Sequence, residues 1–179
     1  MTAFSTSSIE RNFIEAIRRR PDRDLPRLMY ADWLEERSDP RGELIRVQCL
    51  LARMPAMAPG RTDLEARERR LLSDHYEAWI EEPLVLIGVK RAEFRRGLIE
   101  SLEVDAEQWL AQLPLLLERA PLARRLTLSH SADFLDRVAG SSALESLETL
   151  DLSANAIGNS GAEILELSPH LQRLRKLEL

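Results

Sequence analysis

The stretch Leu147-Glu-Thr-Leu150-Asp-Leu152-Ser-Ala-Asn155 decides the fold of this 179-residue chain. It contains an aliphatic residue, two spacers, an aliphatic residue, one spacer and a third aliphatic residue, a pattern that we call the strand template. Because Leu150 and Leu152 alternate with polar residues, the template predicts a strand with one buried face. Asn155 follows where the chain must turn, and we expect its side-chain amide to bind backbone groups that the turn leaves open.

The strand template occurs four times in the second half of the chain. The copies begin at Ile99, Ala123, Leu147 and Leu174, so their starts lie 24, 24 and 27 residues apart. Helix-compatible sequence follows each of the first three copies, and a helix capped by Asp105 is expected to end at Pro114. Such a period is typical of strand-helix units that must stack to bury their apolar faces. We predict an α/β solenoid with a parallel sheet over residues 98–179, with about three to four units, the last incomplete.

Residues 1–97 show the spacing of short helices instead. Start signals occur at Asp24 and at Asp39-Pro40, and the capping box Thr62-x-x-Glu65 opens a long charged helix. Residues 54–61, with two prolines and a glycine, predict a loop. We therefore predict that residues 1–97 form a helical N-terminal cap, which covers the open apolar end of the first strand-helix unit.

Two family resemblances fit this division. Residues 144–179 resemble leucine-rich repeats of the ribonuclease-inhibitor type, through their leucine and asparagine framework, Gly158, Gly161 and Leu171-x-x-Leu174. The N-terminal half resembles the bacterial repeat-companion domain, a small module often found ahead of such repeats. That likeness is carried by residues 26–37 (Pro-Arg-Leu-Met-Tyr-Ala-Asp-Trp-Leu-Glu-Glu-Arg), residues 39–48 (Asp-Pro-Arg-Gly-Glu-Leu-Ile-Arg-Val-Gln) and residues 94–98 (Phe-Arg-Arg-Gly-Leu). The resemblance implies an association with repeats and supplies no catalytic residues.

The outward-pointing residues of the template strands form the candidate binding face. Successive side chains of a strand point to opposite sides, so the neighbours of the buried leucines face away from the core. Stacking aligns them into a concave, mostly polar surface, the usual binding face of solenoids. The candidate partner-binding residues are Ser101, Glu103, Arg125, Thr127, Thr149, Asp151, Lys176 and Glu178. We expect a non-catalytic scaffold that binds a protein there; the alternative is that the face of so short an array is only solvated.

A rival hypothesis concerns the string Tyr30-Ala31-Asp32-Trp33. It makes the chain a regulatory or ligand-binding subunit of an enzyme or toxin system, with a site around Asp32, Arg41 and Glu43. The structural interpretation puts Trp33 in the core and pairs Asp32 with a helix start or with an arginine such as Arg27 or Arg41. A solvent-open pocket holding Asp32, Arg41 and Glu43 would favour the rival.

Other reactive residues lack the spacing that their chemistry needs. Ser129-His130-Ser131 with Asp133 contains hydrolase residue types, but four neighbours at a strand exit do not converge from separate elements on an oxyanion hole. His75, His130 and His170 have no zinc-site spacing. The chain contains no GxGxxG, GxxxxGK[ST] or GxSxG motif. We therefore predict no enzymatic activity, no metal and no cofactor.

The composition of the chain argues against several further classes of protein. The chain holds 25 Lys and Arg against 30 Asp and Glu, which argues against a general nucleic-acid binder. The clusters at residues 18–20 and 95–96 are expected to be solvated or ion-paired. Cys49 is the only cysteine, so it is expected to be a buried hydrophobe without a disulfide. Residues 1–10 lack the apolar run of a secretory signal, and residues 84–89 are too few to span a bilayer, so we predict a cytoplasmic protein without membrane contact.

The fourth copy of the strand template reaches its last leucine at Leu179. No helix follows that leucine in this sequence. We expect this strand to leave an open apolar edge, through which the chain can associate with another chain or with residues absent from this sequence.

Overall fold

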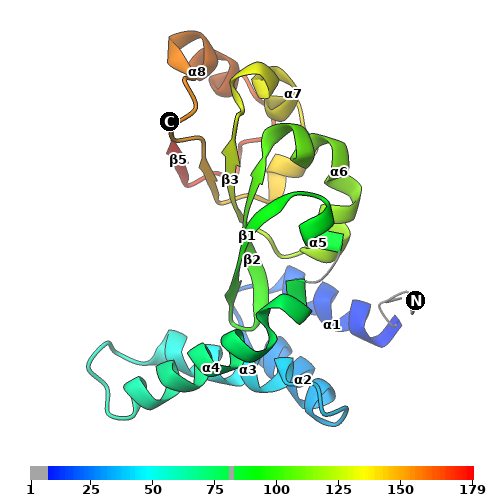
Figure 1. The fold of residues 1–179 in the computed structure, drawn as a ribbon, viewed down its shortest axis with the longest axis vertical. Coiled ribbons are helices and arrows are strands. Elements are labelled where there is room, and N and C mark those ends of the chain that lie inside the picture. Colours follow the sequence, from blue (N-terminus) through cyan, green and yellow to red (C-terminus); the bar gives the residue numbers. More distant parts are fainter. Residues whose placement is uncertain (1–7, 81–82) are drawn as a thin grey trace. The chain divides into compact units, whose positions relative to one another are not determined.

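The computed structural model describes residues 8–80 and 83–179, which divide into two compact units (Figure 1). The first unit contains the described residues up to Trp79 together with Arg95–Leu98, and the second contains Ile80–Phe94 and Ile99–Leu179. This division differs from the expected boundary after residue 97, because a strand that the sequence analysis missed lies mostly in the second unit. Ser7 and the residues before it lie outside the described part.

The first unit is helical, as predicted. Its helices are α1 (Ser8–Arg19), α2 (Asp24–Glu35), α3 (Arg41–Arg53) and α4 (Arg61–Ile80, whose last residue belongs to the second unit). The side chains at the centre of α2 and α3 are almost fully buried and include Tyr30, Leu34, Leu44 and Ile45. These apolar residues recur at helical spacing, so α2 and α3 each bury one stripe against the other.

Of the two predicted helix starts, at Asp24 and at Asp39-Pro40, only the second has a capping aspartate. Asp39 lies before α3 as a cap, since its Oδ1 accepts the backbone N–H of Arg41 at 2.9 Å. Asp24 does not cap α2, which corrects the prediction. Its carboxylate is 8% exposed and instead binds Arg53 Nε at 2.5 Å and Arg96 Nη1 at 3.3 Å. In these bonds both the donor and the acceptor are ionised, whereas a cap bond pairs the carboxylate with a neutral backbone N–H.

The second unit is built on a sheet of strand order β1-β2-β3-β4-β5. The strands are β1 (Val89–Arg95), β2 (Leu98–Asp105), β3 (Arg125–Ser129), β4 (Thr149–Asp151) and β5 (Lys176–Glu178). Strands β2 to β5 coincide with the four copies of the strand template and pair in parallel, which confirms the predicted parallel arrangement. The described fold is therefore mixed α/β with a mostly parallel sheet.

The register of the sheet follows the sequence period. Leu102 pairs with Leu126, Leu126 with Leu150, and Leu150 with Leu177. The same position of each template copy therefore lies side by side across the sheet. Consecutive helices of this unit contact one another (Figure 1). Their apolar residues form one core with Leu102, Leu126 and Leu150.

In the second unit a helix precedes β1, and helices also lie between the successive parallel strands β2 to β5. They are α5 (Pro83–Leu86), α6 (Ala106–Arg119), α7 (Leu135–Ala139) and α8 (Gly158–Glu166), with short 3-10 helices at Ala132–Phe134 and Ser142–Ser146. Helix α6 continues through Pro114, where the sequence analysis expected it to end. A proline inside a helix removes one backbone hydrogen bond. Packing of Trp109 and Leu116 on either side of it, at 4% and 2% exposure, holds the helix together.

Strand β1 (Val89–Arg95) differs from the prediction that residues 1–97 form a helical cap. Only Arg96 and Gly97 connect β1 to β2, and both have positive φ, of 45° and 79°. Such a two-residue connection is typical of a hairpin between antiparallel strands. The buried residues of β1 include Val89 and Ala92, which are three positions apart, so the strand lacks the regular alternation by which strands are found in a sequence.

Candidate functional site

The register of the sheet brings all eight candidate binding residues together in two rows. The first row runs through Ser101, Arg125, Thr149 and Lys176, and the second through Glu103, Thr127, Asp151 and Glu178. On β2, β3 and β4 these side chains are half-buried and alternate with buried leucine and valine. They therefore point away from the core, as the period of two predicts. We call this surface the strand face.

The two rows carry opposite charge. The first row holds the cations Arg125 and Lys176, and the second holds three carboxylates, of which Asp151 accepts the backbone N–H of Ser153 at 2.9 Å. Lys176 forms an ion pair with Glu178 two residues along the same strand, and that hydrogen bond raises the pKa of Lys176. Within the described part of the chain, Glu103 makes no hydrogen bond or ion pair, so its carboxylate is free for a ligand.

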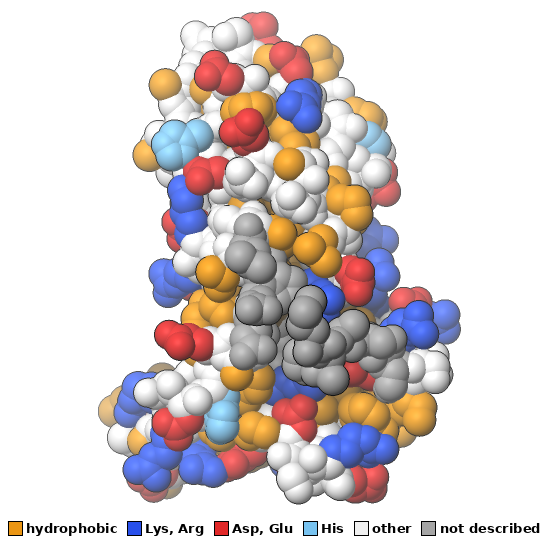
Figure 2. Space-filling view, turned by 45° about the vertical axis from the view of Figure 1, so that its right-hand side comes forward, with side chains coloured by type: hydrophobic (Ala, Val, Ile, Leu, Met, Phe, Trp, Pro, Cys, Tyr) orange, Lys and Arg blue, Asp and Glu red, His pale blue; other side chains and the backbone are white. Residues whose placement is uncertain are grey.

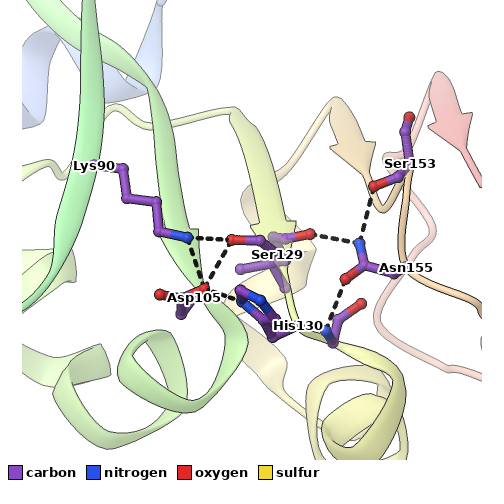
Figure 3. Close-up of polar contacts among 8 residues, drawn as sticks. Lys90, Asp105, Ser129, His130, Ser153 and Asn155 are labelled. Atoms are coloured by element: carbon purple, nitrogen blue, oxygen red, sulfur yellow. Dashed lines mark hydrogen bonds and ion pairs between the residues drawn. The ribbon is translucent and has the colours of Figure 1, made fainter.

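A polar cluster lies where β2 and β3 end (Figure 3). Asp105 Oδ1 accepts hydrogen bonds from Lys90 Nζ at 2.8 Å and Ser129 Oγ at 2.8 Å, and His130 Nδ1 lies 2.6 Å from it. Lys90 Nζ also lies 2.7 Å from Ser129 Oγ. The hydrogen bonds from Lys90 and His130 hold the pKa of Asp105 well below its ordinary value. We call these four residues the Asp105 cluster.

The geometry of the Asp105 cluster does not activate a nucleophile. Ser129 Oγ donates to Asp105 and not to His130, so the serine-to-histidine hydrogen bond of a catalytic triad is not formed. Lys90 is engaged as a donor to Asp105 and Ser129, and a donating ammonium is no base. Asp105, expected to cap α6, makes no cap hydrogen bond because its carboxylate is bound in the cluster. The cluster therefore joins β1, β2 and the turn after β3.

The predicted role of Asn155 is confirmed. Its side chain lies in the turn after β4, and the residue is 8% exposed (Figure 3). Oδ1 accepts the backbone N–H of Ser131 at 2.8 Å, while Nδ2 lies 2.7 Å from the carbonyl oxygens of Leu128 and Leu152 and 3.2 Å from that of Ser153. The amide thereby satisfies backbone groups of two consecutive turns.

The three residues of the rival hypothesis bind different partners in the helical unit, and no partner is shared between them. Those partners are Arg46 for Asp32, Asp39 and Glu10 for Arg41, and Arg67 for Glu43. The arginine partner of Asp32 is therefore neither Arg27 nor Arg41, in contrast to the expectation. The Asp32–Arg46 pair is open to solvent, with the two side chains 62% and 39% exposed. The hydrogen bond from Arg67 lowers the pKa of Glu43.

The string around Tyr30 is occupied by structural contacts. Tyr30 donates its hydroxyl hydrogen to Glu10 Oε1 at 2.6 Å, and burial raises the pKa of Tyr30. Trp33 lies 6.0 Å from the Tyr30 ring, and the guanidinium of Arg37 covers it at 4.0 Å from its centroid. Trp33 is half-buried, in a cluster that also contains Phe13. The string therefore makes structural contacts, but Trp33 is only partly buried and does not lie in the core as expected.

Arg27 was missed by the sequence analysis as a structural residue. It is 0% exposed and directs Nη1 to the carbonyl oxygens of Arg95 and Arg96, at 3.5 and 3.3 Å, and Nη2 to that of Pro21 at 3.3 Å. A buried guanidinium that binds carbonyl groups of distant segments fixes those segments. No local sequence pattern predicts these contacts, because Arg95 and Arg96 are 68 and 69 residues away from Arg27.

The surface charges are mixed in sign. Basic and acidic side chains are interspersed over the face drawn in Figure 2. Of the basic clusters, Arg18 and Arg19 pair with Glu15, and Arg96 pairs with Asp24. This agrees with the prediction of ion-paired or solvated clusters.

Residues 8–80 and 83–179 contain neither a metal-binding cluster nor a membrane-spanning helix. No group of three or more His, Cys, Asp or Glu side chains there is placed to hold a metal ion. None of the helices in those ranges has both the length and the apolar character that crossing a bilayer requires.

The chain matches no protein-family model, no curated protein and no solved structure.

Proposed function

We propose that this chain is a non-catalytic scaffold of leucine-rich repeats that binds another protein through the strand face. In this proposal the helical unit is a repeat-companion cap, and the second unit contains the repeats. The observation that supports it most is the register of β2 to β5, which aligns the candidate residues in two polar rows. Sequence copies 24, 24 and 27 residues apart and the hydrogen bonds of Asn155 between consecutive turns also support repeats.

The strand face suits a protein better than a small molecule. Its residues come from four neighbouring strands, which in a sheet lie about 4.8 Å apart, so the rows extend along a surface and do not enclose a pocket. The residues stand on the hydrogen-bonded backbone of a sheet, and a backbone that is fixed before a partner arrives lowers the entropic cost of binding. Rows of opposite charge fix the orientation of a partner with complementary charges.

Affinity capture from cells of the native host tests the proposal. The bait is the whole chain, either unchanged or carrying Glu103→Ala, Arg125→Ala and Asp151→Ala together. A matched control carries Glu163→Ala, Glu166→Ala and Arg173→Ala, which remove the same charge types from exposed positions outside the strand face. All three baits must show the same circular dichroism spectrum. We expect a specific partner to be lost from the strand-face variant alone, and undiminished capture by that variant would overturn the proposal.

A further inference from the structure

Two segments that are far apart in the sequence meet at the buried side chain of Arg27. Its Nη2 donates to the carbonyl oxygen of Pro21, in the turn between α1 and α2. Its Nη1 donates to the carbonyl oxygens of Arg95 and Arg96, at the end of β1. All four residues belong to the first unit. The turn between α1 and α2 therefore lies close to the connection between β1 and β2.

The end of α3 reaches the same place through Asp24. The two oxygens of this carboxylate bind Arg53 Nε at 2.5 Å and Arg96 Nη1 at 3.3 Å. Arg53 makes no other side-chain hydrogen bond or ion pair with a residue of the described ranges, and its side chain is 63% exposed. Its two terminal nitrogens are therefore open to a ligand. Three segments of the first unit thus bring arginines to one place.

Positive charge is in excess at this place. Its charged residues are Arg20, Arg23, Arg27, Arg53, Arg95 and Arg96 with Asp22 and Asp24, which together we call the arginine patch. Six cations against two carboxylates give the patch a net charge of +4, whereas the whole chain carries −5. The patch is therefore opposite in sign to the chain as a whole.

Three arginines of the patch have no acceptor for their side chains within residues 8–80 and 83–179. They are Arg20, Arg23 and Arg95, all of them exposed. Like charges that are held close together repel, so a negatively charged ligand lowers the electrostatic energy of the patch. The hydrogen bonds of Arg27 and Asp24 fix the segments that carry these arginines before a ligand arrives, which lowers the entropic cost of binding.

We propose that the arginine patch binds an acidic segment of a protein, whose Asp and Glu side chains pair with Arg20, Arg23 and Arg95. The terminal nitrogens of Arg53 offer a further pair of donors. A guanidinium can give a carboxylate two parallel hydrogen bonds, and clusters of arginine are a recurrent means of recognising acidic motifs. The first unit then has a binding surface of its own, in addition to the strand face of the second unit.

The patch suits a protein segment better than a nucleic acid. The side chain of Asp22 is 87% exposed within the patch, with its carboxylate 3.9 Å from Arg96 Nη2, and it repels a continuous row of phosphates. Proteins that bind single strands also supply aromatic side chains on which bases stack, and the patch consists of Arg and Asp alone. A short acidic segment can contact the arginines and leave Asp22 in solvent.

Fluorescence anisotropy of a labelled octaglutamate peptide, titrated with the whole chain at low salt, tests the proposal. The patch variant carries Arg20→Gln, Arg23→Gln and Arg95→Gln together, which removes no hydrogen bond or ion pair between described side chains. We expect this variant to bind the peptide about tenfold more weakly than the unchanged chain, because three exposed ion pairs are lost. Binding by the unchanged chain should weaken as salt is added, since the charges are open to solvent.

The matched control carries Arg11→Gln, Arg69→Gln and Arg70→Gln. It lowers the net charge by the same amount at exposed helical positions that have no described partner either, and it should bind like the unchanged chain. Circular dichroism verifies that both variants are folded. The variant of the strand face keeps the arginine patch and should bind the peptide undiminished, so this proposal and the scaffold proposal fail or succeed separately.

Three outcomes would overturn the proposal. The first is that the folded, unchanged chain does not bind octaglutamate at low salt. The second is that the patch variant and the matched control lose the same affinity, which would reduce the effect to net charge. The third is that a labelled oligothymidine of the same charge binds the patch more tightly than the peptide does, which would make a nucleic acid the better ligand.

Discussion

The backbone N–H of Ser131 donates a 2.8 Å hydrogen bond to Oδ1 of Asn155, a residue 24 positions further along the chain. Ser131 follows β3 and Asn155 follows β4, so this bond joins equivalent turns of consecutive strand-template copies. The amide nitrogen of the same side chain binds the carbonyl oxygens of Leu128 and Leu152, one from each copy. The 24-residue spacing of the copies therefore corresponds to a contact in the structure, because the Asn155 side chain holds two neighbouring units in register.

Replacing Asn155 by alanine should destabilise the second unit strongly. The change leaves a buried N–H and buried carbonyl groups without their partner, and we expect a loss of about 3 kcal/mol in the free energy of unfolding. Urea denaturation followed by circular dichroism measures it. Asn159→Ala is the matched control, because Asn159 is exposed on α8 and should change stability by less than about 0.5 kcal/mol. Equal effects of the two changes would contradict the assigned role of Asn155.

Asn155 and strands β2 to β5 could be predicted because their signals are local and repeated. The template gives each strand the same alternation, and the turn asparagine stands at a fixed offset from it. The Asp105 cluster could not be predicted in the same way. Its members Lys90 and His130 are 15 and 25 residues from Asp105, and Lys90 lies on β1, the strand without regular alternation. Long-range polar contacts depend on strand order, which no local pattern specifies.

The resemblance to the repeat-companion domain singled out residues 94–98 without giving a reason for Gly97. In the structure Gly97 has a φ of 79°, and its backbone N–H donates to Gln48 Oε1 at 2.6 Å. A Cβ atom at Gly97 would lie 2.1 Å from Cγ1 and 2.6 Å from Cα of Ile45. The contact is with α3, 52 residues earlier in the chain, so the need for glycine is a property of the tertiary structure.

Gly97→Ala should therefore destabilise the helical unit by more than backbone strain alone. Ile45 is 0% exposed and its Cα cannot be displaced without moving α3, so we expect a loss of about 3 kcal/mol or more. Gly60→Ala provides the control, because Gly60 also has a φ of 79° but no atom within 4 Å of the added Cβ. Its loss should be about 1 kcal/mol, the cost of the left-handed conformation. Thermal and urea unfolding of both variants measure the difference, and similar losses would show that the contact with Ile45 does not matter.

The thiol of Cys49 should be unreactive in the folded chain. Burial raises the pKa of Cys49 to about 11, and the residue is 2% exposed. Since the thiolate is the reactive form, a pKa about two units above the ordinary value lowers its population roughly 100-fold at pH 8. We expect modification by an aromatic disulfide reagent to be at least that much slower in buffer than in concentrated urea. Every reacted thiol is Cys49, because the chain has one cysteine, and fast modification of the folded chain would contradict its burial.

The Asp105 cluster predicts a pH-dependent stability. The pKa of Asp105 is lowered by hydrogen bonds from Lys90 and His130, so the carboxylate stabilises the folded chain at any pH above the ordinary aspartate pKa of about 3.9. Below that pH the unfolded chain takes up a proton that the folded chain still excludes. The stabilisation therefore falls as the pH drops towards the lower pKa of the folded state. Because the Asp105 side chain is 31% exposed, solvent screening limits the effect to about 1 kcal/mol.

Urea unfolding of the unchanged chain and of Asp105→Asn, from about pH 5 to about pH 2.5, measures this effect. The window lies below the range in which imidazoles ordinarily titrate, so the carboxylate dominates the difference between the two proteins. We expect the unchanged chain to be more stable at pH 5 and its advantage to shrink as the pH falls. Asp133→Asn removes an exposed carboxylate near the same strand end, and its effect should not vary over this range. A constant gap between the unchanged chain and Asp105→Asn would mean that the ionised carboxylate does not stabilise the junction of β1, β2 and the turn after β3.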